Sequence, residues 1–194
     1  MIFTENDKEY FLETSRLVSP EELQQGLFTV IAGVDKIPPH IALINEGMYY
    51  SVSAKKVEAG VPVVNFFKAI SRKTIPALFI EIKRHTGLVS EGGAGITVIF
   101  NSYPVLGNGP HSCLWPVRDF FAETFSKKYS KASFVFELLA IAEKDGLIAG
   151  CKSVFMDTPS LGSPQVGNHS RVVLSKYTQR QIREKINSLL ARTG

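Results

Sequence analysis

The segment that most constrains the fold runs over residues 26–53, where short apolar runs alternate with turn residues. Residues 27–32 are β-branched and aromatic, which predicts a strand. A second apolar run over 41–44 follows a Pro-Pro-His sequence. Asn45-Glu46-Gly47 is typical of a hairpin turn, because glycine adopts the positive φ that such turns require. Residues 48–54 would then return as the partner strand, so we expect the fold to open with antiparallel hairpins.

The rest of the chain mixes helical and strand patterns. The glycine-rich segment 91–95 predicts a turn, and residues 157–170 predict a long polar loop. Early hairpins followed by mixed elements favour an α+β fold, a mostly antiparallel sheet of about six strands with about five helices. We expect helices over 4–15, 19–26, 62–72, 113–126, 132–144 and 178–191. The second of these helices begins with a capping box of Ser19 and Glu22. Further strands are expected over 75–83, 96–100, 147–156 and 171–176.

Length and composition indicate an ordinary globular protein. The chain has 194 residues, 44% of them hydrophobic and 21% charged, which predicts a single globular domain over 1–194 with a sizeable core. No apolar run approaches the ~20 residues of a membrane helix, and the acidic N-terminal sequence is unlike a secretory signal. We therefore expect a cytoplasmic protein in which Cys113 and Cys151 are free thiols.

The charge and motif content argue against several classes of function. The net charge is +4, and the Lys and Arg residues are scattered, whereas a nucleic-acid surface gathers them in a stripe. No pair of residues has a metal-ligand spacing, so no metal is expected. The glycines of 91–95 lack the Gly-Lys-Ser/Thr ending of a phosphate loop, and we expect no cofactor.

Two residues have the chemistry of a cysteine nucleophile site. Pro116 is tolerated only in a first helical turn, which places Cys113 at a helix start, where the helix dipole favours the thiolate. Pro39 restricts the backbone before His40, at the entry of a strand, and a nearby imidazole could take the thiol proton. His111 is a local alternative base. A lone Cys in an apolar helix is also commonly a buried core residue, and a lone His at a strand entry is commonly structural.

Several of these features resemble a known family. Three successive segments are similar to the opening of circularly permuted papain-like enzymes. They are Leu23-Gln24-Gln25-Gly26 before a strand, then His40-Ile41-Ala42-Leu43-Ile44, then Gly47 with the strand 48–53. These include the lecithin:retinol acyltransferase-like group, relatives of the NlpC-type peptidases. The strand 75–83 and the order of His before Cys also match. The resemblance covers residues 23–125 and implies a permuted papain-like core.

The resemblance also implies roles for individual residues. Cys113 would be the nucleophile, His40 its base, and Ser51 the group that orients the imidazole. The family usually carries His or another strongly polar group at the position of Ser51, whereas a serine hydroxyl has no charge with which to stabilise an imidazolium. Tyr49, Tyr50, Tyr103 and Trp115 are candidates for lining a substrate cleft.

Two classes of function remain open from the sequence. The first is a cysteine hydrolase or acyltransferase acting on an amide or ester, with a small molecule, lipid or peptide as substrate. The second is a non-catalytic α+β protein that binds a peptide, a partner protein or an anionic ligand. In that case His40 and Cys113 would be unrelated core residues.

Overall fold

The computed structural model describes residues 9–16, 19–34, 36, 38–83, 92–106, 111–156 and 169–175. In this part of the chain, eight strands form one sheet in the order β5-β4-β3-β2-β6-β7-β1-β8. The strands are β1 (Glu9–Arg16), β2 (Leu27–Ala32), β3 (His40–Asn45), β4 (Met48–Val52), β5 (Val57–Pro62), β6 (Ala77–Ile82), β7 (Ile148–Val154) and β8 (His169–Ser175).

The sheet is mixed, because β1 pairs with β7 in parallel while the other neighbours pair in antiparallel. The α+β class is confirmed, with a sheet that is larger than the sequence predicts. The register from β2 to β3 runs without a break from Leu27↔Asn45 to Ala32↔His40. His40 is therefore fixed at the end of a fully paired strand.

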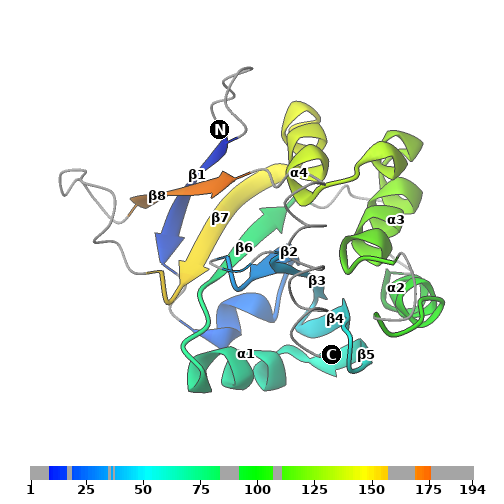
Figure 1. The fold of residues 1–194 in the computed structure, drawn as a ribbon, viewed down its shortest axis with the longest axis horizontal. Helices are drawn as coiled ribbons and strands as arrows, with labels where there is room; N and C mark the ends of the chain where they lie inside the picture. The colour runs from blue at the N-terminus through cyan, green and yellow to red at the C-terminus, as the bar shows by residue number, and fades with distance from the viewer. Residues whose placement is uncertain are drawn as a thin grey trace, which may run out of the picture.

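The helices lie on both faces of the sheet. In Figure 1, α1 lies on one side, while α2, α3 and α4 lie on the other. Two 3₁₀ turns, η1 and η2, complete the described elements. The bounds are α1 (Val63–Arg72), α2 (Gly92–Asn101), α3 (Leu114–Thr124), α4 (Val135–Lys144), η1 (Pro20–Leu23) and η2 (Lys127–Lys131).

Two apolar cores result, one on each face of the sheet. Alternate residues of β2 divide between them: Leu27 and Ile31 belong to the core under α2, α3 and α4, while Phe28 and Val30 belong to the core under α1. All six residues of β2 are buried. A strand that is covered on both faces reads as a continuous apolar run rather than an alternating one, which is why residues 27–32 give such a clear strand signal.

The expected helix over 4–15 is wrong where the structure describes it. Residues Glu9–Arg16 form β1, which pairs from Glu9 to Ser15 with β8 and at Ser15 and Arg16 with β7. Both partners lie more than a hundred residues away in the sequence. Pairing with distant strands overrides a local helical preference, because it satisfies the same backbone groups while placing the side chains on a sheet.

The expected strand over 96–100 is also wrong, and so is the turn over 92–95, because α2 begins at Gly92 and includes both; residue 91 lies outside the described residues. Ile96 and Phe100, one helical turn apart, are buried, whereas Val98 between them is 69% exposed. Phe100 packs against Tyr50 with ring centroids 5.6 Å apart. The β-branched composition favours a strand locally, but the i, i+4 packing on β4 and β5 selects a helix.

Other expectations are confirmed close to their predicted bounds. The predicted strands over 41–44, 48–54, 75–83, 147–156 and 171–176 correspond to β3, β4, β6, β7 and β8, and the predicted helices over 62–72, 113–126 and 132–144 correspond to α1, α3 and α4. Ser19 and Glu22 form the expected capping box at η1. The predicted helix over 178–191 and residues 157–168 of the predicted loop lie outside the described residues. No helix in the described ranges is long and apolar enough to cross a membrane.

Candidate functional site

The thiol of Cys113 lies directly on the backbone of the strand that carries His40. Cys113 is the N-cap of α3, as the sequence predicts. The backbone N–H of Ile41 donates to Cys113 Sγ at 3.4 Å, across 72 residues of sequence. Sγ in turn faces the carbonyl oxygen of Pro39 at 3.9 Å. The sulfur therefore contacts the residues on both sides of His40.

This contact arises where β3 and β4 separate. β3 pairs with β2 from His40 to Asn45, but its pairing with β4 covers only Leu43 to Asn45. The Ile41 amide is left without a strand partner on that side, and a buried amide needs an acceptor. The sulfur of Cys113 supplies it. The start of α3 is thus attached to the sheet through the thiol itself.

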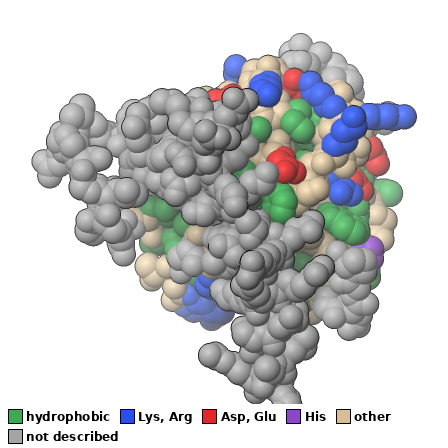
Figure 2. Space-filling model, turned by 45° about the horizontal axis from the view of Figure 1, so that its top comes forward, with side chains coloured by type: hydrophobic (Ala, Val, Ile, Leu, Met, Phe, Trp, Pro, Cys, Tyr) green, Lys and Arg blue, Asp and Glu red, His purple; other side chains and the backbone are tan. Residues whose placement is uncertain are grey.

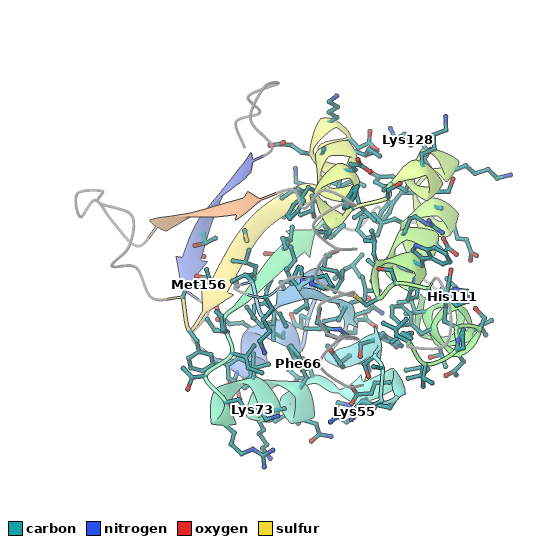
Figure 3. The ribbon with its side chains drawn as sticks, in the orientation of Figure 1. Lys55, Phe66, Lys73, His111, Lys128 and Met156 are labelled. Atoms are coloured by element: carbon teal, nitrogen blue, oxygen red, sulfur yellow. The ribbon has the colours of Figure 1, made fainter. Side chains whose placement is uncertain are left out.

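The imidazole of His40 is hydrogen-bonded to a phenol. His40 Nε2 lies 3.3 Å from the Tyr49 hydroxyl. Tyr49 is buried in β4, and its ring stacks on Phe66 with centroids 4.3 Å apart and planes 11° from parallel. Figure 3 shows Phe66 between α1 and the sheet. The α1 face therefore fixes the position of the phenol that meets the imidazole.

Ser51 reaches the imidazole only through Tyr49. Ser51 is 1% exposed. It lies beside the Tyr49 hydroxyl, and its own hydroxyl donates to Glu58 Oε2 at 3.5 Å on the adjacent strand β5. The other oxygen of Glu58 pairs with Lys56 Nζ at 2.7 Å. Among the described residues, the hydroxyl that is hydrogen-bonded to the His40 ring is that of Tyr49. The family resemblance implies that Ser51 would have this role.

The environment favours neutral forms of both His40 and Cys113. Burial raises the pKa of the Cys113 thiol, although the Ile41 N–H and the backbone at the start of α3 oppose this rise. Burial lowers the pKa of His40, and the nearby Glu58 opposes this change. Desolvation disfavours the charged form of each group. At rest the site therefore holds a thiol and a neutral imidazole.

No direct hydrogen bond joins the imidazole to the sulfur among the described contacts. The thiol is directed at Pro39 and the imidazole at Tyr49. The two groups nevertheless share one short stretch of backbone.

The predicted cleft residues separate into two places. Tyr50 faces the other side of β4, where it is 2% exposed and packs on Phe100. Trp115 and Tyr103 instead meet around His111, with ring centroids 5.1 Å and 6.1 Å from it. Figure 3 places His111 beside α2 and α3. The sequence groups these aromatic residues, but the structure puts Tyr50 in the core.

Two charged residues of α3, Arg118 and Asp119, contact the aromatic rings around His111. The Tyr103 hydroxyl donates to Asp119, which also accepts from Arg118 Nε at 3.0 Å. The Arg118 guanidinium lies 5.3 Å from the centre of the Trp115 ring. The His111 ring meets the rings of Tyr103 and Trp115 edge to face, so this cluster packs around the segment before Cys113. Nδ1 of His111 is buried without a hydrogen-bond partner among the described atoms, and no hydrogen bond there joins His111 to the thiol of Cys113.

The sequence does not point to Glu58, and it offers Tyr49 only as a candidate for lining a cleft, not as a partner of His40. Tyr49 lies two residues before Ser51 in the same strand, so the twofold period of a strand would have placed both on one face. Glu58 lies on β5, which the sequence analysis did not predict. No local pattern identifies it, because its relation to His40 depends on the pairing of β4 with β5.

Metal and nucleic-acid chemistry receive no support from the described part of the chain. No three His, Cys, Asp or Glu residues there are placed to hold a metal ion. Figure 2 shows Lys and Arg at separate places on one face, with Asp and Glu among them.

Comparison with known proteins returns no match: no protein-family model, no curated protein and no solved structure matches this chain.

Proposed function

We propose that this protein is a cysteine hydrolase or acyltransferase acting on an amide or ester, with Cys113 as the nucleophile and His40 as its base. The observation that carries the proposal is the Ile41 N–H to Cys113 Sγ contact of 3.4 Å. It brings a thiol at a helix start to the strand end that bears the imidazole. The proposal requires in addition that the imidazole of His40 come within hydrogen-bond reach of the sulfur.

The neutral resting state decides how the first step proceeds. His40 would take the proton from Sγ as the sulfur attacks the carbonyl carbon, which is general-base catalysis rather than attack by a preformed thiolate. The backbone N–H of Cys113, near the sulfur at the start of α3, would stabilise the oxyanion. His40 would then give the proton to the leaving group. The acyl-enzyme would pass its acyl group to water or to another acceptor.

Acylation of the thiol tests this proposal directly. The full chain is incubated with p-nitrophenyl acetate and p-nitrophenyl octanoate, and acyl adducts are located by mass spectrometry of peptides. We expect acylation at Cys113, abolished in Cys113→Ala and slowed by about 10²–10⁴-fold in His40→Ala, since that is the usual contribution of a positioned base. The matched control is Cys151→Ala, because Cys151 is a buried thiol whose pKa is raised to about 12 by burial. This variant should be acylated as fast as the wild type.

An inert Cys113 would overturn the proposal. If the thiol reacts only on unfolding, or equally fast with and without His40, it is a core residue. The partly buried position and the raised pKa of Cys113 would then support the alternative, a non-catalytic protein that binds a peptide, a partner protein or an anionic ligand.

A further inference from the structure

We propose that Tyr49 and Glu58 are positioning residues for His40, linked by Ser51, so that a carboxylate on β5 acts on the imidazole through two hydroxyls. This inference rests on the proposed function of the Cys113 and His40 site. The chain of contacts runs from His40 Nε2 to Tyr49 (3.3 Å), to Ser51, and from Ser51 to Glu58 (3.5 Å).

The carboxylate at the far end sets the direction of the hydrogen bond from Ser51. An ionised carboxylate only accepts, so the Ser51 hydroxyl must donate to Glu58. The Ser51 oxygen is then free to accept from Tyr49, and the Tyr49 oxygen is free to accept from His40. When Tyr49 donates to Ser51, the ring proton lies on Nε2 and is donated to the Tyr49 oxygen. Nδ1, the nitrogen nearer the backbone that Cys113 contacts, keeps its lone pair and is the base.

The same chain supplies the charge that Ser51 lacks. When Nδ1 takes the proton from Sγ, the S–C bond forms, the carbonyl π bond opens and the ring becomes an imidazolium. The negative Glu58 favours that cation. The Nε2 proton stays in place, because burial holds the pKa of Tyr49 above its ordinary value and keeps the phenol neutral. The Nδ1 proton goes to the leaving group when the C–X bond breaks.

Tyr49→Phe is the sharpest test, because it removes one oxygen and keeps the ring that stacks on Phe66. Nitrogen-15 NMR of labelled protein reports the tautomer of His40, assigned by the signal lost in His40→Gln. We expect the wild type to be protonated at Nε2 and Tyr49→Phe to lose that preference. Tyr50→Phe is the matched control, since Tyr50 is the next residue but faces the opposite core, and should leave the tautomer unchanged.

Glu58→Gln removes the charge and keeps the size of a side chain that is 21% exposed. We expect His40 to titrate at lower pH than in the wild type, because the carboxylate that favours the imidazolium is gone. Glu123→Gln, on the exposed side of α3, makes the same change in net charge. It should leave the titration of His40 where it is.

Unchanged tautomer and titration in both Tyr49→Phe and Glu58→Gln would overturn the inference. Since these readouts need no substrate, they separate the two proposals. A shifted His40 without any acylation of Cys113 would keep the chain of contacts and remove the enzyme. Acylation that depends on His40 but not on Tyr49 or Glu58 would keep the enzyme and remove the positioning role.

Discussion

At the scale of single residues, the site is defined by a mismatch between chemistry and environment. A thiol at a helix N-terminus is usually a good candidate for a low pKa, yet burial at Cys113 outweighs the helix start and raises it. The sulfur accepts from Ile41 and faces the carbonyl of Pro39, as a protonated thiol can. Reactivity at this position therefore depends on its base.

The pH dependence of acylation follows from these two shifts. His40 works as a base only when neutral, and its pKa is lowered from the ordinary 6.5. The acylation rate at Cys113 should therefore rise with pH through a midpoint below 6.5 and then stay level. Direct thiolate attack would appear only above pH 9, because the pKa of Cys113 is raised from 9.0. A stopped-flow pH profile with p-nitrophenyl acetate measures this.

The profile of His40→Ala is the comparison. The acylation rate of His40→Ala should lose the rise with pH below 6.5 and keep the rise above pH 9. A wild-type profile with only an alkaline rise would show that His40 does not act on the thiol.

At the scale of elements, the β3–β4 hairpin sets the distance between His40 and Tyr49. Its turn uses two residues with positive φ, Glu46 at 49° and Gly47 at 74°. Gly47 also donates to the Leu23 carbonyl at 3.1 Å and accepts from Val63 at 2.7 Å. One turn thus connects η1, the hairpin and the start of α1.

Gly47→Ala should destabilise the protein by about 1–2 kcal/mol, because an L-residue is strained at this φ. A Cβ there would also lie 2.4 Å from the Gln24 side-chain oxygen. Urea denaturation measures the change. Gly150→Ala on β7 is the control, since its Cβ would meet no atom within 4 Å, and its stability should not fall. Equal stability of the two variants would mean that the turn tolerates a side chain.

At the scale of the whole molecule, the two cores hold the two halves of the site. The core under α1 includes Tyr49 and Phe66, while the core under α2, α3 and α4 holds the helix that Cys113 begins. The thiol of Cys113 and the phenol that holds His40 lie near one strand end because both helical layers pack on one sheet. A substitution that loosens the packing of α3 should therefore change the position of Cys113, even where the substituted residue does not contact Cys113.

Phe121→Ala should cost about 3–5 kcal/mol of unfolding free energy, as large cavities in well-packed cores do. Phe121 is fully buried, with the rings of Phe125 and Tyr129 each 5.3 Å away. Val98→Ala is the control, because Val98 is 69% exposed, and surface truncations usually change stability by less than about 0.5 kcal/mol. Urea denaturation distinguishes them, and a similar loss in both would contradict this account of the core.

The sequence by itself determined the elements whose signals are local. Three such signals are the apolar run of β2, the positive-φ turn before β4 and the proline that marks the start of α3. Each depends on neighbours within a few residues, because backbone sterics and side-chain period act at that range. Tertiary structure alone decided β1, α2 and β5. Their backbones satisfy local propensity in more than one way, and distant partners make the choice.

The same division runs through the site. The residue types of Cys113 and His40, and their places at element ends, are readable in the chain. The contact of Sγ with Ile41, the phenol of Tyr49 on the imidazole and the carboxylate of Glu58 behind it are not. They exist because β3 parts from β4 beside the start of α3 and because β5 pairs with β4. Such registers depend on how the whole sheet packs, which no short stretch of sequence specifies.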